Sequence, residues 1–332
     1  MDAKILTNGL YDNMLAMGIG GGITFFTPTY NRAQFLKRVY DCLLQQTNNL
    51  FCWIVVNDGS TDETDEIMRH ILDENDLPIC YISKNNGGKH SAFKYALEQC
   101  QTELFQCLDD DDLYDKESVA FFVDAWKRVK LETRHDIGAI RTLTRRKDGS
   151  FMANPDIKPD EMGHYYDVTT LEMNYIFHRY QENWTCYNTE KLRTIDLFDK
   201  DYWLSDKHKF FQESIWQGRF ARRYKCRYYN VAFREYSTEA GTSILRGKKT
   251  RQHYIDMFIN TYIANNEQYD FISRSFPRLL SNIVLVSMLR GFLNIKICEV
   301  VHHSANIHLK LLYTLFYPLG IVGKFVVRRK VE

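Results

Sequence analysis

The sequence predicts an α/β fold with a mostly parallel central sheet, followed by a C-terminal helical region. Three observations support this class. Short apolar runs alternate with amphipathic stretches of helical length from residue 23 to residue 143, a pattern typical of βαβ units. Roughly the last 80 residues have helical spacing. The chain has 332 residues, 45% of them hydrophobic, so it can bury a large core, which excludes a disordered or fibrous protein.

The predicted elements follow in order along the chain. Runs rich in apolar and β-branched residues predict five strands, at ITFFT (23–27), FCWIVVN (51–57), ICYIS (79–83), ELFQCLD (103–109) and IGAIRTL (137–143). Helical spacing predicts helices between them, over residues 32–46, 62–74, 88–100 and 116–130. Ligands of such sheets gather beyond the carboxyl ends of the strands, so the residues that end each run are the first candidates for a site.

The pattern is less regular after residue 143. Residues 144–183 are polar and contain two of the six prolines, which predicts an insertion or a long loop. We then expect a strand at WTCYN (184–188), helices from residue 189 and over 213–224, and an extended segment at CRYYNVAFREY (226–236). The expected domains are a flexible leader at 1–22 that includes the glycine cluster GIGGG (18–22), an α/β domain at 23–240 with halves at 23–143 and 144–240, and a helical region at 241–332.

The net charge of +1 conceals a segregation of charge along the chain. Residues 1–218 hold 24 Lys and Arg against 35 Asp and Glu, a net charge of −11, whereas residues 219–332 hold 19 against 7, a net charge of +12. This predicts a metal in the acidic part and phosphates or anionic lipid at the basic part, where residues 219–251 alone carry +8. The acidic first half argues against a nucleic-acid partner.

Cysteine usage and the two ends of the chain bear on location. The eight cysteines include no Cys-x-x-Cys pair, so buried reduced thiols of a cytoplasmic protein are expected rather than a zinc or redox site. The N-terminal residues lack the pattern of a secretory signal. The uncharged run LLYTLFYPLGIVG (311–323) is shorter than the roughly 20 residues of a bilayer span. Residues 308–332 are therefore expected to contact the inner face of the cell membrane peripherally, or to pack within the protein or on another subunit.

The strongest local signal is the run of four aspartates, Asp109, Asp110, Asp111 and Asp112, that follows the apolar residues LFQCL. Adjacent carboxylates repel one another, and a bound cation relieves that repulsion. Their oxygens suit Mg²⁺ or Mn²⁺, which leave positions open for substrate phosphates. Because side chains alternate in direction, Asp109 and Asp111 are the expected ligands, and Asp112 can serve the local backbone. A solvated turn that caps the next helix is the alternative.

A second signal is NDGSTDE (57–63), at the end of the second predicted strand. Gly59 permits a sharp turn, and Ser60, Thr61 or Asp62 can cap the following helix. The carboxylate of Asp58 can accept the imide N–H of a uracil or thymine ring. Turn and cap chemistry alone is the alternative, and it explains Asp58 less well than its neighbours.

A third signal is NNGGKHSAF (85–93), another junction between a strand and a helix. Gly87 and Gly88 let the backbone approach a ligand closely, and Lys89 adds positive charge at a helix N-terminus, which favours a phosphate. The segment is not a P-loop, because the pattern G-x-x-x-x-G-K-[ST] is absent.

The fourth signal is FTPTYNR (26–32), after the first predicted strand. Pro28 is expected to end the strand, Tyr30 offers a flat face for a base, and Asn31 can cap the next helix. A strand stop followed by a helix cap, with no ligand, is the alternative.

Together these junctions resemble the family 2 glycosyltransferases of GT-A fold, a Rossmann-like α/β architecture. The quoted residues are similar to that family's P-x-Y-N, V-x-D-G-S-x-D, G-G-K-x-x-A and L-D-x-D-D-x-Y segments, in this order, over about residues 22–125. The resemblance implies a metal, Mn²⁺ or Mg²⁺, at Asp111 with Asp109, although Asp110 stands where the family usually has a small residue. The implied donor-binding residues are Pro28, Thr29, Tyr30, Asn31, Arg32, Asp58, Gly87, Gly88, Lys89, Asp109 and Asp110.

The second half resembles a bacterial surface-polysaccharide branch of the same family. The stretch KFFQESIWQGRFARRYKCRYYN (209–230) is similar to a segment in which Phe-x-x-Glu precedes W-x-R and a basic helix, and this match puts Glu213 at the catalytic base position. The sequence departs from that segment at Gln212, where Pro is common. Asp206 and Glu182 are therefore competing candidates. The acceptor-side candidates are Glu182, Trp184, Asp206 and Asp112.

The resemblance implies an inverting, metal-dependent transfer of a sugar from a nucleotide-diphosphate donor, with a UDP-sugar favoured, to a glycan or lipid-linked acceptor. Capsule, O-antigen or exopolysaccharide synthesis is the expected setting. A sugar-nucleotide nucleotidyltransferase is an alternative, but FTPTYNR lacks the glycines expected after the first strand of such an enzyme. A non-catalytic sugar-binding or lipid-binding module is the other alternative.

Overall fold

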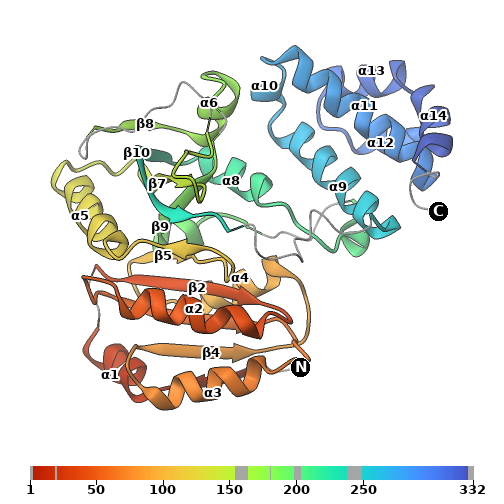
Figure 1. Cartoon of the computed structure of the whole chain (residues 1–332). Coiled ribbons are helices and arrows are strands. Elements are labelled where there is room, and N and C mark those ends of the chain that lie inside the picture. The colour runs from red at the N-terminus through yellow and green to blue at the C-terminus, as the bar shows by residue number, and fades with distance from the viewer. Residues whose placement is uncertain are drawn as a thin grey trace. The chain divides into compact units, whose positions relative to one another are not determined.

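The computed structural model describes residues 3–18, 21–153, 164–179, 181–197, 203–237 and 249–327. They belong to two compact units. Figure 1 labels the helices and strands. The first unit is drawn from residues 1–169, 179–195 and 223–241 and contains the sheet. The second is drawn from residues 170–178, 196–222 and 242–332 and is helical.

Four parallel strands form the centre of the first unit. They lie in the order β4 (Ile79–Ser83), β3 (Phe51–Asn57), β2 (Ile23–Thr29) and β5 (Leu104–Cys107). Every residue of β3 is buried, which is typical of a parallel strand with both faces covered. These are the first four predicted strands, so the α/β class with its parallel central sheet is confirmed.

The sheet continues beyond β5 with mixed pairing. Strand β9 (Asn183–Asn188) is antiparallel to both β5 and β7 (Ile137–Arg145), and β10 (Lys225–Glu235) is parallel to β7. The short strands β6 (Leu113–Tyr114) and β8 (Tyr166–Val168) pair with β10 in antiparallel orientation. The strands found among the described residues thus form a single sheet, whose antiparallel pairings were not predicted.

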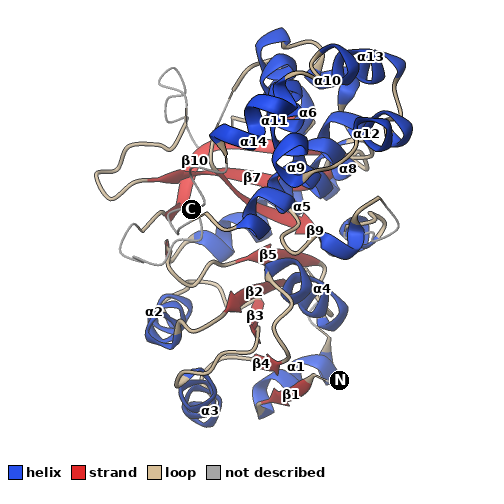
Figure 2. Cartoon of the chain, turned by 90° about the vertical axis from the view of Figure 1, so that its right-hand side faces the viewer, coloured by secondary structure: helices blue, strands red, loops and turns tan. Residues whose placement is uncertain are grey.

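Helices cover both faces of the parallel strands. In Figure 2, α2 (Ala33–Leu44) and α3 (Thr64–Glu74) lie on one side of the sheet, and α4 (Lys89–Gln99) lies on the other. Helix α2 buries Leu36, Val39, Tyr40 and Leu43, whose spacing forms one apolar stripe. The helices α5 (Ser118–Leu131) and α7 (Thr189–Arg193) also belong to this unit.

The structure contradicts the expectation of a flexible leader for the described residues before Ile23. Residues Lys4–Thr7 form β1, an edge strand antiparallel to β4, and Gly9–Met17 form α1. Asn8 links both elements to the sheet, because its amide donates to Leu77 O and its Oδ1 accepts from the backbone of Ile79 and Tyr11. The signal was weak because β1 is short and mostly exposed. Residues 19 and 20 of the glycine cluster lie outside the described residues.

The segment predicted as an insertion or long loop is also partly regular. It contributes the end of β7, the strand β8 and the helix α6 (Thr170–Tyr175), which belongs to the second unit. Residues 154–163, within this segment, lie outside the described residues.

The second unit confirms the predicted C-terminal helical region. Besides α6, it contains η1 (Ser205–Lys207), α8 (Glu213–Ala221), α9 (Arg251–Glu267), α10 (Tyr269–Ile272), α11 (Phe276–Leu293), α12 (Ile297–His303), α13 (Ile307–Leu315) and α14 (Leu319–Val326). Helices α11 and α14 pack closely at glycines, since a Cβ on Gly323 would lie 2.0 Å from Met288 O. Among the described helices, α11 is long and apolar enough to cross a membrane, and the pair α13 and α14, bent by 63°, meets the same criteria together.

Candidate active site

The four predicted junctions lie side by side at the carboxyl ends of β2, β3, β4 and β5. The backbone of Asp58, after β3, donates to Thr29 O at the end of β2 (2.9 Å). The carboxylate of Asp58 accepts hydrogen bonds from the backbone N–H groups of Gly87 (2.9 Å) and Gly88 (2.7 Å), just before α4. The ammonium of Lys89, in α4, lies 2.8 Å from Asp109 Oδ1, after β5. A continuous series of contacts therefore joins all four motifs into one site.

Asp58 forms the centre of this series and is buried within it. Besides the two glycine N–H groups, it forms an ion pair with Lys84, which directly follows β4. Gly59 adopts φ +82°, and a Cβ there would lie 2.8 Å from Asn86 N, so the turn requires glycine. Asp58 thus holds two loops together. Its expected role as an acceptor for a base stays a prediction.

The four aspartates alternate between exposed and buried positions. The side chains of Asp109 and Asp111 are 33% and 23% exposed, whereas those of Asp110 and Asp112 are 6% and 2% exposed. The alternation in direction expected from the sequence is therefore present, and it leaves the carboxylates of Asp109 and Asp111 partly exposed.

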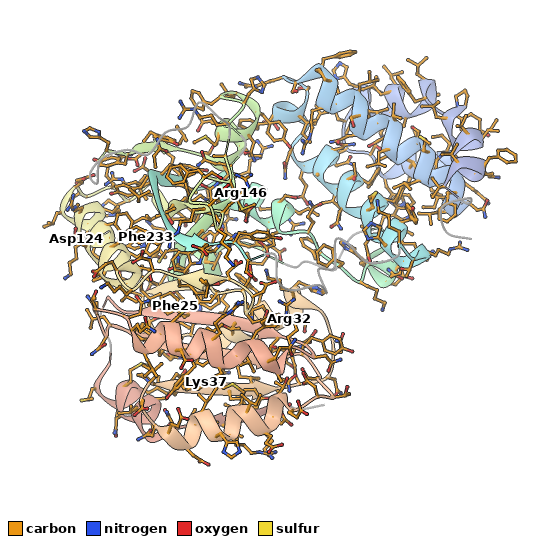
Figure 3. All side chains as sticks on the ribbon, viewed as in Figure 1. Phe25, Arg32, Lys37, Asp124, Arg146 and Phe233 are labelled. Carbon is orange, nitrogen blue, oxygen red and sulfur yellow. The ribbon has the colours of Figure 1, made fainter. Side chains whose placement is uncertain are left out.

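Basic side chains of the protein itself neutralise this acidic cluster. Arg32 contacts both Asp110 (2.9 Å) and Asp111 (2.7 Å), and Figure 3 shows it at the carboxyl end of β2. Arg234, from β10, contacts Asp112 (3.3 Å) and Glu182 (2.8 Å). The sequence-based argument that a bound cation is needed to relieve the repulsion is thus incomplete, because arginine and lysine already supply positive charge.

Burial and these cations set the pKa values of the cluster in opposite directions. Burial opposes ionisation of Asp109, but nearby Lys89 and Arg234 lower its pKa to about 2. Burial raises the pKa of Asp110 to about 7 against the effect of Arg32, and it raises the pKa of Asp112 to about 7 against the effect of Arg234. Asp109 is consequently ionised more readily than Asp110 or Asp112.

The donor atoms fit a metal that shares its ligands with a substrate. Within the described residues, no group of three or more His, Cys, Asp or Glu side chains is arranged to hold a metal ion by itself. Mg²⁺ and Mn²⁺ do not require such a cage, because one or two carboxylates with substrate phosphates and water complete their coordination. The partly exposed carboxylates of Asp109 and Asp111 fit that kind of site.

The β2 junction presents one exposed ring. Tyr30 is 48% exposed, whereas Thr29 is buried and Pro28 is half-buried at the end of β2. The expectation that Asn31 caps α2 is wrong: its carboxamide accepts from the backbone of Thr61, and Asp62 accepts from Ala33 N at the start of the helix. Asn31 and its neighbours instead join the β2 loop to the β3 loop.

Two acceptor-side candidates are internal groups rather than surface groups. The ring of Trp184 is 2% exposed, donates to Cys107 O (2.8 Å) and packs against Tyr114 beneath the acidic cluster. Asp112 pairs with Arg234 and accepts from Ser237 N, so it binds groups of the protein itself, although this backbone N–H is distant in the chain and not local as expected. Contact of either side chain with an acceptor was a wrong expectation, because the sequence alone does not reveal their burial. Glu182 is about half exposed.

The candidate base lies in the second unit. Glu213 is the first residue of α8 and is exposed, and Asp206, its competitor in that unit, is exposed in η1. The contacts described in the first unit do not involve Glu213, so its assignment as the base stays a prediction.

The basic segment 219–251 is less available than its charge suggests. Arg219 pairs with Glu267 and Arg222 with Asp270, both in the second unit. In the first unit, Arg227 is fully buried and pairs with Glu132 and Asp167. These arginines stabilise the fold, so the expectation that the segment as a whole faces a phosphate ligand is wrong for them. Residues 238–248 lie outside the described residues.

Sequence reasoning missed two basic residues of the site. Lys84 neutralises Asp58, and Arg234 bridges Asp112 to Glu182. Lys84 was detectable in principle, because it directly follows a predicted strand, as the recognised site residues do. Arg234 lies at the end of a strand more than 120 residues from the aspartates, and no local pattern connects it with them.

Comparison with known proteins identifies the family. The model of glycosyl transferase family 2 matches residues 24–189, which include the junctions described above. The chain belongs to glycosyl transferase family 2. The resemblance in the four motifs is thereby confirmed at the level of the family, and the active-site candidates of the first unit can be considered as parts of a family 2 domain.

Curated relatives and solved structures agree with this family. An uncharacterised glycosyltransferase of Rickettsia typhi is 39% identical to this chain over 92 residues, which are 28% of each protein. The teichoic acid poly(glycerol phosphate) polymerase of Staphylococcus epidermidis is 30% identical over 108 residues, which are 32% of this chain and 15% of the polymerase. The chain thus matches less than a third of these relatives. Residues 1–349 of S. aureus TarS in complex with UDP-GlcNAc share the fold, with a TM-score of 0.58 and 17% identity over 93% of this chain and 92% of the other. The mannosyltransferase PcManGT of Pyrobaculum calidifontis, in complex with GDP-Man and Mn²⁺, has a TM-score of 0.54 and 15% identity over 91% and 86%.

Proposed function

We propose that the protein transfers a sugar from a nucleotide-diphosphate donor, with UDP-sugars favoured, to a glycan or a lipid-linked saccharide. The family assignment and the UDP-GlcNAc complex of the TarS fragment support a nucleotide-sugar donor. The sequence-based expectation of capsule, O-antigen or exopolysaccharide synthesis at the inner face of the cell membrane is part of this proposal. So is the division into a catalytic domain that includes residues 23–240 and a helical region at 241–332.

The observation that carries the proposal is the series of contacts along the carboxyl edge of the sheet. Asp58 joins the loop after β3 to Gly87 and Gly88 in the loop after β4. Lys89, which follows these glycines, joins the loop after β4 to Asp109. A nucleotide diphosphate has a base, a ribose and two phosphates, and it needs several groups held at fixed spacing. An edge with an exposed ring at Tyr30, a glycine loop and partly exposed carboxylates at Asp109 and Asp111 supplies them together.

The basic residues of the edge have a clear task in this proposal. Lys89 is the first residue of α4, where both its ammonium and the helix N-terminus favour a phosphate. Arg32 holds Asp110 and Asp111 in place. Both side chains lie at the acidic cluster and stabilise negative charge that develops on a departing diphosphate.

The exposed carboxylates would hold the metal. Asp111 and Asp109 would bind Mn²⁺ or Mg²⁺, which when bound neutralises charge on the donor diphosphate. Arg234 and Lys89 help keep Asp109 ionised, so that it can act as a ligand. The Mn²⁺ in the PcManGT complex is consistent with a metal in proteins of this fold.

For the acceptor we propose Glu213 as general base. A carboxylate that removes the proton of the acceptor hydroxyl during direct displacement leads to inversion at the anomeric carbon, and such a base contributes roughly 10² to 10⁴ in rate. Glu213 is exposed at the start of α8 and is therefore accessible to an acceptor. Asp206 and Glu182 remain its competitors.

The proposal is tested with purified protein, Mn²⁺ and a panel of nucleotide sugars, scored by release of the nucleoside diphosphate. We expect Asp111→Ala and Glu213→Gln to abolish transfer while far-UV circular dichroism stays unchanged. The control is Asp124→Ala, because Asp124 is an exposed carboxylate on α5 that lies away from Arg32 in Figure 3. Transfer near the wild-type rate by Glu213→Gln would discard Glu213 as the base, and full activity of Asp111→Ala in EDTA would discard the metal.

We also propose peripheral membrane contact through residues 308–332. Helices α13 and α14 expose large apolar side chains to an unusual extent: Leu311, Leu315, Ile321 and Phe325 are all more than half exposed. Ile307, Leu311 and Leu315 recur every four residues and form one apolar stripe on α13. Lys310 and Lys324 lie among them and can meet anionic headgroups.

Co-sedimentation with phosphatidylglycerol-containing vesicles tests this contact. We expect Leu311→Glu combined with Leu315→Glu to abolish sedimentation. Leu131→Glu is the matched control, since Leu131 is 83% exposed on α5, outside this stripe. Equal loss in both variants, or no binding by the wild type, would refute the contact.

A further inference from the structure

The second unit contains a polar hollow that the preceding proposal does not use. It has a volume of about 160 Å³ and opens among helices α6, α8, α9 and α11. Its lining belongs to this unit alone. Residues that line it include Asn174, Gln212, Ser214, Thr261, Arg278 and Asn282.

The lining has an unusual chemistry. Six of its side chains are carboxamides, three carry aliphatic hydroxyl groups, and none is a carboxylate. A carboxamide both donates and accepts hydrogen bonds, which matches the hydroxyl groups of a sugar or polyol. The single charged residue is Arg278, which is exposed, and among the described residues no ion pair is found for its guanidinium. The hollow thus combines groups for hydroxyls with one group for an anion.

Buried contacts hold the carboxamides in position. Asn282 donates to Oδ1 of Asn265 (2.8 Å), and the amide of Asn265, which is fully buried, donates to Tyr313 (3.0 Å). Gln268, which also lines the hollow, donates to Ser214 O (3.2 Å). It packs so closely on Gly218 that a Cβ there would lie 2.2 Å from the amide nitrogen of Gln268. Side chains fixed in this way lose little freedom when a ligand binds.

We propose that this hollow binds a polyhydroxylated unit that carries an anionic group. Its volume suits one sugar or polyol residue rather than a larger molecule, since pockets for drug-sized ligands exceed roughly 300 Å³. Gln212 and Ser214, which line the hollow, flank Glu213 in the chain. The identification of this ligand as part of the acceptor, next to the base, rests on the proposed function. Binding itself does not.

Ligand-observed NMR on the full chain tests the proposal. The probes are glucose 6-phosphate, glucuronate, glucose and inorganic phosphate, each measured with saturating UDP and Mg²⁺ so that the donor site does not contribute. The first two probes distinguish a phosphate from a carboxylate as the anion. We expect at least one of them to bind roughly tenfold or more tightly than glucose or inorganic phosphate alone, because one charged and several neutral hydrogen bonds act together.

Two variants and one control connect that binding to the hollow. Arg278→Ala should weaken the anionic sugar roughly tenfold or more, to the level of glucose, and Asn174→Ala should weaken it several-fold. Arg274→Ala is the control, because Arg274 is an exposed arginine close by in the chain that does not line the hollow. UDP binding should be unchanged in all three variants, whose folding is checked by thermal unfolding.

Absence of binding by all sugars, or equal binding by Arg278→Ala and Arg274→Ala, would overturn the proposal. Failure of the wild type to bind UDP would instead count against the proposed donor and would leave the result for the hollow standing.

Discussion

Replacing Arg234 tests whether protein cations, rather than a metal, stabilise the buried part of the acidic cluster. Arg234 is 7% exposed, and its guanidinium lies 3.3 Å from Asp112 and 2.8 Å from Glu182. Arg234→Met keeps the volume but leaves the nearly inaccessible carboxylate of Asp112 without its partner. Because the pKa of Asp112 is about 7, this carboxyl can take up a proton near neutral pH, so the loss is that of a charged hydrogen bond, about 1–3 kcal/mol of the free energy of unfolding out of the typical 5–15 kcal/mol.

The matched control removes the other partner of Arg234. Glu182 is 51% exposed at its side chain, so Glu182→Gln should cost at most about 1 kcal/mol. The double variant Arg234→Met with Asp112→Asn removes the uncompensated charge and should recover most of the loss.

Urea unfolding followed by circular dichroism, without added metal, measures all four proteins. The reasoning is refuted if Arg234→Met costs less than about 1 kcal/mol, or if the double variant is no more stable than Arg234→Met. Either result would mean that the Asp112 carboxylate is not held by this arginine.

Three further predictions concern the rest of the fold. Gly323→Ala should lower the melting temperature by several degrees, because the added Cβ would lie 2.0 Å from Met288 O. Gly9→Ala is the control and should not lower it, because the atom nearest to that Cβ is 4.0 Å away. Equal effects of the two variants would contradict the close packing of α11 and α14. Lys84→Met should destabilise the protein by about 3–5 kcal/mol in urea unfolding, since it leaves Asp58 buried without its ion pair, and a neutral effect would show that the glycine N–H groups suffice. The hydrogen bond from Arg227 lowers the pKa of Glu132 below its usual 4.5, so stability from this pair is present above that pH and is lost as the pH falls through the lowered value. Glu132→Gln should therefore flatten the drop in melting temperature between pH 6 and pH 3, an effect worth at most about 1 kcal/mol, and an unchanged drop would refute it.

The predictable part of the fold is the part with strong periodicity. The run FCWIVVN became β3 with the predicted bounds, and the helical spacing of residues 62–74 became α3 (Thr64–Glu74), because buried elements require a continuous apolar pattern. Strand β1 and helix α6 are only four and six residues long, and β1 pairs with a strand far along the chain. Their local patterns were therefore too weak to predict them.

The candidate site follows the same division. The kinds of residue at the strand ends, such as Asp58 and Asp109, could be recognised from local order alone, because turn chemistry and strand ends are properties of a few adjacent residues. The burial of those residues and their partners could not be recognised from local order. Trp184, for example, was expected from the sequence to contact the acceptor, but its ring is buried in the structure.

The sequence by itself determined the α/β class, the four junctions and the family, since periodicity and short motifs are encoded by neighbouring residues. Only the tertiary structure decided which charges meet. Lys84 pairs with Asp58, Arg234 with Asp112, and the carboxamides of the second unit surround one hollow, in each case across a long separation in the chain. The physical reason is that Coulomb interactions and desolvation depend on distance in space and on burial, and the packing of distant elements sets both.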